Sequence, residues 1–204
     1  DREGFGEGNY NLQLDRAAAR RFKSVRTVLI ETMGLPRLSP RFDWQYFPEW
    51  DRSDSREVPC VNGAFMLMRT DLLRELQGLD DSVFMYLEDL DLCWRVRDLG
   101  MSVWFCADAV ATHVGGASTA AGDVDQQAIA HLHRLDGTIE FIVRTGRPGT
   151  RPVVVALLVV QSILGLIQGL ASRESVRVAR HRRALPWLGR QLVQRRPPPP
   201  VPSR

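Results

Sequence analysis

The pattern of apolar and polar residues predicts one well-defined helix, which starts near Glu88 and stops at Gly100. Its apolar positions recur at the three- and four-residue spacing of a single helix face: Leu92, Val96 and Leu99. Three carboxylates lie in its first turn, where acidic side chains favour a helix start: Glu88, Asp89 and Asp91. This preference alone would explain the acids, and Asp91 can also pair with Arg95 one turn later.

The same kind of pattern predicts the remaining elements. We expect a basic helical stretch at 12–22, a strand-like run at 61–69 entered through Asn-Gly, a short helix at 71–76, a strand at 101–106 and a long helix at 125–144. His131 and His133 lie two residues apart on the last of these helices, so they project from different sides of it. We therefore expect solvated histidines there and no metal chelation by the pair.

Residues 34–58 predict an irregular surface loop, because prolines and charges interrupt any apolar period. The loop carries five aromatic side chains: Phe42, Trp44, Tyr46, Phe47 and Trp50. The alternation of the first three suits a half-buried strand and favours packing against a sheet. The functional alternative is a rim for a sugar acceptor, since sugars stack on aromatic faces.

Composition adds a charge asymmetry. The 204 residues fit one domain plus appendages, and the net charge of +3 is unevenly placed, because residues 173–196 hold many arginines and a single acid. Such a tail indicates an anionic surface, either lipid or nucleic acid. The three cysteines predict buried small side chains in a reducing compartment, not a zinc site or a disulfide framework: Cys60, Cys93 and Cys106.

Residues 152–172 form an uncharged run of about the length that spans a bilayer. The run is not uniformly apolar, because small and polar residues recur along it: Gln161, Gly165, Gln168 and Ser172. Gly165 and Gly169 also form a Gly-x-x-x-Gly pair. This stripe predicts a partner helix or a protein surface against the run.

Three blocks in the order Asn62-Gly63-Ala64, Glu88-Asp89 and His113 carry a family resemblance between about Pro59 and Ser118. In identity, order and spacing they resemble the C-terminal half of the catalytic domain of inverting family 2 glycosyltransferases. The nearest subgroup is the rhamnosyltransferase-like enzymes of bacterial cell-wall and surface-polysaccharide assembly. The resemblance implies an α/β fold: an incomplete GT-A (Rossmann-like) mixed sheet with flanking helices, plus C-terminal membrane-associated helices.

The resemblance also implies roles for these blocks. Asp89 would be the base that takes the proton of the acceptor hydroxyl, while Glu88 and Asp91 would position acceptor hydroxyls or support the helix start. Asn62, Gly63 and Ala64 would line the donor–acceptor cleft. His113 would be a ligand of a divalent metal, Mn²⁺ or Mg²⁺, although a lone histidine in this place could also simply cap a strand end.

Near the N-terminus, the family's Gly-Phe-x-x-x-Asn block maps to Gly4, Phe5 and Asn9, which would line the nucleotide-sugar pocket. On spacing alone the same residues suit a flexible glycine-rich loop. Between Asn9 and Pro59 the chain has no Asp-x-Asp or Asn-Pro-Asp, the acidic motif that the family places there to hold the metal and the diphosphate. The resemblance therefore implies that most of the nucleotide-binding half is missing and that the chain could be an inactive fragment.

These inferences divide the chain into four parts: 1–22 as a remnant of the nucleotide-binding region, 23–146 as the acceptor and catalytic half, 147–196 as hydrophobic and basic amphipathic membrane-associated helices, and 197–204 as a disordered proline-rich tail. A single span at 152–172 would place the arginine-rich tail in the cytosol and the catalytic half outside. Nucleotide sugars are cytosolic, so we expect a re-entrant or interfacial helix at the cytoplasmic face of the membrane. A basic amphipathic segment would follow it on anionic lipid, through Leu185, Trp187, Leu188, Leu192 and Val193.

Two hypotheses of function follow. The first is a membrane-associated glycosyltransferase with a nucleotide-sugar donor and a lipid-linked or cell-envelope polysaccharide acceptor. The second is a catalytically incomplete remnant that acts as a binding or partner-docking module at the membrane. Binding of nucleic acid by the arginine tail is not expected, because that tail adjoins an apolar run and contains few interleaved aromatics.

Overall fold

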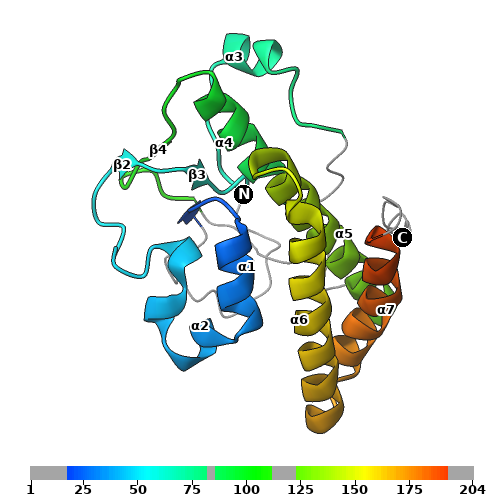
Figure 1. Ribbon diagram of the computed structural model, residues 1–204. Coiled ribbons are helices and arrows are strands. Elements are labelled where there is room, and N and C mark those ends of the chain that lie inside the picture. The colour runs from blue at the N-terminus through cyan, green and yellow to red at the C-terminus, as the bar shows by residue number, and fades with distance from the viewer. Residues whose placement is uncertain (1–17, 82–85, 112–122, 193–204) are drawn as a thin grey trace, which may run out of the picture.

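The computed structural model describes residues 18–81, 86–111 and 123–192, and every structural statement below concerns these ranges. Four residues of the expected site lie outside them: Gly4, Phe5, Asn9 and His113. The described part is mainly helical. Two small sheets lie beside the helices, and three long C-terminal helices run side by side (Figure 1).

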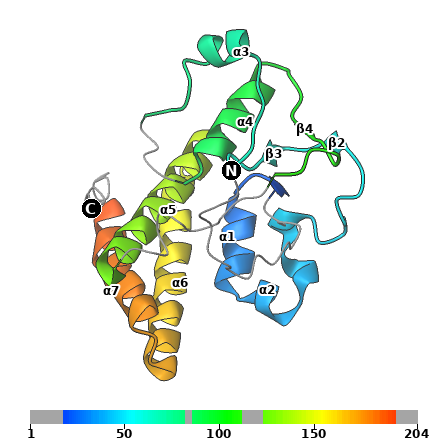
Figure 2. The same ribbon diagram turned by 180° about the vertical axis from the view of Figure 1, so that it is seen from behind.

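The three long helices are α5 (Val124–Thr145), α6 (Thr150–Ser172) and α7 (Ser175–Gln191). Asp123 caps α5 by accepting a hydrogen bond from the backbone N–H of Gln126, the arrangement of a capping box. Buried side chains of all three helices form one core with α4: Leu90, Ile139, Val154, Val155 and Leu188. Seen from behind, α1 lies against α6 and away from α7 (Figure 2).

The predicted central helix is present as α4 (Glu88–Asp98). It ends at Leu99, and Gly100 follows with a φ of +78°, a left-handed conformation that suits glycine. The predicted ion pair between Asp91 and Arg95 is also present, with 2.9 Å between Oδ2 and Nε. The acidic first turn and the glycine stop were therefore sufficient to place this helix.

The described strands are only two residues long and form two antiparallel pairs. β1 (Ala19–Arg20) pairs with β3 (Cys60–Val61), and β2 (Arg56–Glu57) pairs with β4 (Trp104–Phe105). The structure is thus a mixed helix and strand arrangement, but its described residues do not assemble the larger mixed sheet of a complete GT-A fold.

The short elements of the N-terminal half are α1 (Val25–Thr32), α2 (Leu35–Leu38), η2 (Pro40–Phe42), η3 (Trp44–Tyr46) and α3 (Thr70–Glu75). The predicted short helix at 71–76 and the irregular segment at 34–58 are therefore confirmed. The predicted helix at 12–22 is wrong over its described end, because Ala19 and Arg20 form β1. The strand expected at 61–69 is wrong beyond Val61, because the Asn62 side chain accepts from the N–H of Ala64 at 2.9 Å and turns the chain.

The aromatic loop divides into a packed part and an exposed part. Trp50 is buried and stacks edge-on against Phe47 and Phe105, as the packing interpretation predicts. Phe42 and Trp44 remain exposed, and Trp44 lies in a single 3-10 turn. The half-buried strand inferred from alternation is therefore wrong, because this turn replaces the extended backbone that alternation requires.

Burial corrects two other expectations. Cys60 and Cys93 are buried free thiols, as predicted, but Cys106 is exposed. His133 is buried and His131 is half-buried, so the predicted solvated histidines are wrong. The reason is that α6 and α7 both pack against α5, which leaves little of its circumference for solvent.

The glycines of the small-residue stripe do contact a partner helix, as predicted. A Cβ on Gly165 would collide with the His181 ring of α7, and a Cβ on Gly169 would lie 3.1 Å from Val178. The expected lipid-facing surface of α7 is wrong for its two central residues, because Trp187 and Leu188 are buried in the core. They belong to the core that α7 forms with α5 and α6, so the helical bundle itself buries this part of the apolar face of α7.

Of the described helices, α6 alone is long and apolar enough to cross a membrane, and a third of its most apolar window is buried within the protein. Its remaining surface displays six large apolar side chains that are 43–61% exposed: Val153, Val160, Ile163, Leu164, Ile167 and Leu170. Their spacing places them on one side of the helix, away from α7. Length and composition alone do not decide between a span and a surface helix.

Candidate functional site

The carboxylate of Asp89 lies at the start of α4 and is held by three donors. Its Oδ2 accepts from the Arg20 guanidinium and from the Gly63 backbone N–H at 3.1 Å, and its Oδ1 accepts from the Leu90 N–H at 2.8 Å. The residue is only 7% exposed. A buried charge needs such partners, because an unpaired carboxylate in this place would be strongly destabilising.

Arg20, which contributes the opposite charge, was not expected from the sequence. Burial acts to lower the pKa of Arg20, but the charge of Asp89 and its other neighbours outweighs burial, and the pKa is raised above its ordinary value. An arginine in a two-residue strand has no sequence signature. Only the pairing of β1 with β3 brings it beside a carboxylate 69 residues later.

The turn at Gly63 meets Asp89 directly, so two of the predicted blocks come together. A Cβ on Gly63 would lie 3.2 Å from the Cβ of Asp89, which is tighter than ordinary packing allows. Asn62 forms the turn by accepting from the Ala64 N–H, while its own N–H donates to Ala18 at 3.0 Å. The small residues therefore bring backbone against the carboxylate, as a closely packed site requires.

The backbone immediately before α4 is strained. Tyr86 and Leu87 both have positive φ, +67° and +70°, a conformation that side chains with a Cβ rarely adopt twice in succession. Gly137 of α5 permits this turn, because a Cβ there would lie 3.0 Å from the Tyr86 carbonyl oxygen. The packing of α5 thus determines where the acidic turn begins.

Glu88 differs from its neighbour because it has little to balance its charge. It is half-buried, and its Oε2 atom is buried without a hydrogen-bond partner. Burial raises the pKa of Glu88 above its ordinary value, and the nearby Asp89 charge adds to this effect. The two adjacent acids therefore differ in environment: the Asp89 carboxylate is ion-paired, and the half-buried Glu88 carboxyl has a raised pKa.

Asp91 is fully buried and belongs to a separate ion-pair network. Its carboxylate pairs with Arg95 of α4 and with Arg144 of α5, which also pairs with Asp80 at 2.8 Å. Arg95 extends the network by donating to the carbonyl oxygens of Leu76 and Gly78. Of the two roles left open for Asp91, support of the helix start matches these contacts.

The implied divalent metal has no ligand set in the described residues, where no group of three or more His, Cys, Asp or Glu side chains could hold one. Two Asp-x-Asp sequences do occur within the described ranges, but both have structural partners. Asp89 and Asp91 bind arginines, Asp123 caps α5, and Asp125 pairs with Arg183 at 2.7 Å. These residues do not fit the metal, and we derive no step through it.

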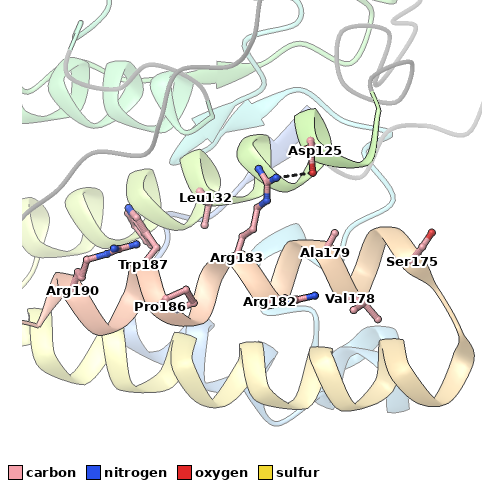
Figure 3. A pocket seen from close by; sticks show the side chains of 10 residues that line it. All are labelled: Asp125, Leu132, Ser175, Val178, Ala179, Arg182, Arg183, Pro186, Trp187 and Arg190. Carbon is pink, nitrogen blue, oxygen red and sulfur yellow. Dashed lines mark ion pairs between the residues drawn. The ribbon is translucent and has the colours of Figure 1, made fainter.

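A hollow of about 680 Å³ lies along α7 and is separate from the acids of α4 (Figure 3). Its lining combines an apolar wall with arginines: Leu132, Pro186, Trp187, Arg182, Arg183 and Arg190. The ion pair of Asp125 with Arg183 crosses it between α5 and α7. The carboxylate of Asp89 does not line this hollow.

The Asp89 carboxylate thus lies at the start of α4, beside an arginine and a glycine turn. Residues 20–130 match the model of the family described as glycosyltransferase like family 2. The match covers more than half of the 204 residues, so the chain belongs to this family. A search of curated proteins found no match, and neither did a search of solved structures.

Proposed function

We propose that the chain is a glycosyltransferase that transfers a sugar from a nucleotide-sugar donor to a lipid-linked or cell-envelope polysaccharide acceptor, with inversion. Family membership supports sugar transfer in general. Rhamnose as the sugar, the class of acceptor and the inverting course are inferred from the resemblance of the blocks between Pro59 and Ser118. The observation that carries the proposal is the placement of Asp89.

Asp89 would act as the base. A carboxylate offers about four lone-pair positions. Donors from the described residues occupy three of those on Asp89, so within this part of the chain one position on Oδ1 would be left for an acceptor hydroxyl. As that hydroxyl oxygen bonds to the anomeric carbon, its proton passes to Asp89 and the bond from carbon to the diphosphate oxygen breaks. Arg20 pairs with the carboxylate and orients it for this transfer.

The neighbouring residues would shape the space for the reactants. Asn62, Gly63 and Ala64 keep side-chain bulk away from the carboxylate, and Glu88 can donate a hydrogen bond to a sugar hydroxyl while it is protonated. The resemblance also implies a divalent cofactor, Mn²⁺ or Mg²⁺. This cofactor, with His113 as one ligand, rests on the resemblance alone.

The direct test is the release of nucleoside diphosphate from a panel of nucleotide sugars by the full chain, with and without Mn²⁺. Asp89→Asn should lower the rate by about 10²–10⁴, the usual contribution of a general base. The matched control is Asp71→Asn, because Asp71 is an exposed acid that pairs only locally with Arg69. A folded Asp89→Asn protein that retains the wild-type rate would overturn the assignment.

We also propose that the protein acts at the cytoplasmic face of an anionic membrane, with α6 lying on the surface or re-entering it. The six exposed apolar side chains of α6 support this, because a contiguous apolar surface of this kind is uncommon on a free monomer. Their opposite face is already packed against α1, α5 and α7, which favours an interfacial helix over a fully lipid-surrounded one.

The second candidate is a non-catalytic module that binds an acceptor or a partner at the membrane. The lack of an acidic metal motif between Asn9 and Pro59 favours it. The two candidates differ in turnover: a folded chain that binds acceptor oligosaccharide but hydrolyses no nucleotide sugar with any divalent metal would be the module.

A further inference from the structure

Basic side chains from three helices gather around the C-terminal half of α6, far along the chain from Asp89. We call them the basic cluster: Arg37 of α2, His131 and Arg134 of α5, and Arg177, Arg180 and His181 of α7. The rings of His131 and His181 stand edge to face with 5.2 Å between their centroids. The charges of Arg134 and Arg180 act on His131, and those of Arg37, Arg177 and Arg180 act on His181.

Several nitrogen atoms of the basic cluster are buried without a hydrogen-bond partner. They are His131 Nε2, His181 Nδ1 and Arg180 Nε. A buried polar atom left without a partner costs about 1–3 kcal/mol. Arg180 Nε is a donor in every state, and both nitrogens of each histidine are donors once the ring is protonated, so an anion would supply the acceptors that these atoms lack among the described residues. The site already described offers none, because the acids of α4 have their own arginines.

The partners that the basic cluster does have are mainly neutral. Arg37 and Arg177 both donate to Gln168 Oε1, at 2.8 and 3.4 Å, and Arg180 donates to Gln127 Oε1 at 2.9 Å. The Arg134 guanidinium lies over the Tyr86 ring, 4.7 Å from its centroid. One carboxylate, that of the exposed Glu174, pairs with Arg177 at 3.0 Å.

The ionisation of these groups reflects the excess of positive charge. Burial, followed by the charges of His181, Arg134 and Arg180, lowers the pKa of His131 to about 3. Burial and the neighbouring arginines likewise lower the pKa of His181, and burial with Arg134 and Arg177 lowers that of Arg180. Each group would regain its proton more easily beside an anion.

We propose that the basic cluster is a binding site for a phosphate-class anion, either a phosphomonoester or a diphosphate. Arginine forks from two or more helices match tetrahedral phosphate oxygens better than they match a single carboxylate. The position also suits such an anion, because the basic cluster borders α6. The other side of α6 carries the six exposed apolar side chains. This inference does not depend on sugar transfer at Asp89.

Anion binding at this site is linked to protonation of the two histidines. In the anion-free protein, burial and the neighbouring positive charges lower the pKa of both histidines, and a bound phosphate would raise the pKa of each. The affinity for the anion therefore increases as the pH falls through the range in which the histidines are protonated in the complex but not in the free protein. The charged groups that act on the two rings in this titration are Arg37, Arg134, Arg177 and Arg180. Behind them, Tyr86 lies against Arg134, and Glu174 pairs with Arg177.

The experiment is a histidine NMR titration of the full chain, with pH varied in the absence and presence of inorganic phosphate or pyrophosphate. We expect the pKa values of His131 and His181 to rise by about 1 to 3 when the anion is bound. His133 is an internal control, because it lies on another side of α5. Assignment uses His131→Gln and His181→Gln.

A second arm of the experiment distinguishes a lipid headgroup from a free phosphate compound. It repeats the titration with vesicles of phosphatidylglycerol or of phosphatidylcholine. A response to soluble phosphate supports a site for a free phosphate compound, and a response only to phosphatidylglycerol supports a lipid headgroup. If neither anion moves either pKa, or if His133 moves equally, the proposal is overturned.

Substitution provides the matched comparison. Arg180→Gln should weaken the anion response at least tenfold, whereas Arg182→Gln should not, because Arg182 lines the hollow on the other side of α7. Arg177→Gln replaces Arg180→Gln if circular dichroism shows that the first variant is unfolded. An unchanged response in the folded variant of the cluster would contradict the proposal.

Discussion

At the scale of single residues, the acidic turn of α4 separates into three different environments. Asp89 is ion-paired beside a glycine turn, Asp91 is locked between two arginines, and Glu88 has a buried oxygen without a partner. Adjacent acids of the same charge thus lie in different environments, because different residues pack around each of them. The chemistry proposed for the site depends on this division.

Glu88→Gln should stabilise the protein at neutral pH. Because the pKa of Glu88 is raised in the folded state, the carboxyl destabilises the fold as the pH rises above about 4.5, its unfolded value, and reaches its full cost above the folded pKa. Thermal melts at pH 4 and pH 7 should therefore show a higher Tm for the variant at pH 7 and almost none of that gain at pH 4. An equal gain at both values would show that ionisation is not the cause.

Asp91→Asn should destabilise the protein by about 3 to 5 kcal/mol, since it leaves Arg95 and Arg144 without their buried counter-charge. Urea unfolding followed by circular dichroism measures this loss. Asp71→Asn is the comparison variant, and its free energy of unfolding should stay close to that of wild type, because Asp71 is exposed. Similar values for both variants would mean that the Asp91 network contributes little.

The identity of these acids could be found from the sequence, but their partners could not. The cluster of three carboxylates before an apolar period indicated the helix start, and Arg95 lies one turn away on the same helix. Arg20 and Arg144 lie 69 and 53 residues from the acids they bind, so only the tertiary packing joins them. No local pattern encodes such a contact.

At the scale of elements, helices were predicted far better than strands. The periods that define α4, α5 and α6 extend over three or more turns, whereas each described strand pairs over two residues. A β-like run such as 61–69 can be ended by one side chain, as Asn62 does at its turn. The partner face of α6 was also predictable, because its glycines leave room for a neighbouring backbone.

Gly165→Ala should weaken the packing of α6 on α7, because the added methyl group meets the His181 ring. We expect a loss of about 1 to 3 kcal/mol, typical of overpacking. Gly189→Ala is a sharp control: nothing lies within 4 Å of its added Cβ, so the helix preference for alanine should give a small gain. A Gly165→Ala protein as stable as wild type would contradict the described contact.

At the scale of the whole molecule, the sequence correctly predicted an apolar helix and a basic helix after residue 146, but the prediction of which surface would be free was wrong. Trp187 and Leu188 satisfy the bundle core, so the apolar surface that remains is on α6. An amphipathic pattern shows that a face needs burial. Whether protein or lipid buries that face depends on neighbours that the pattern does not contain.

The combined substitution Ile167→Glu and Leu170→Glu should abolish flotation with phosphatidylglycerol vesicles while leaving the fold intact, because both side chains are about 60% exposed: 58% and 61%. Flotation on a density gradient and circular dichroism provide the two measurements. Leu79→Glu, at another exposed leucine outside the bundle, should float like wild type. Retained flotation of the double variant would remove α6 from the membrane contact.

The bridge that Arg144 makes to Asp80 and Asp91 has a mechanical consequence. It fixes the first turn of α4 to the C-terminal end of α5, so the Asp89 carboxylate cannot move independently of the three long helices. If the helical bundle lies on a membrane, Asp89 would then stay at one constant height above the membrane surface, which is its elevation. Only acceptors whose reactive hydroxyl reaches that elevation could be served, and the length of the acceptor's anchor would itself be selected.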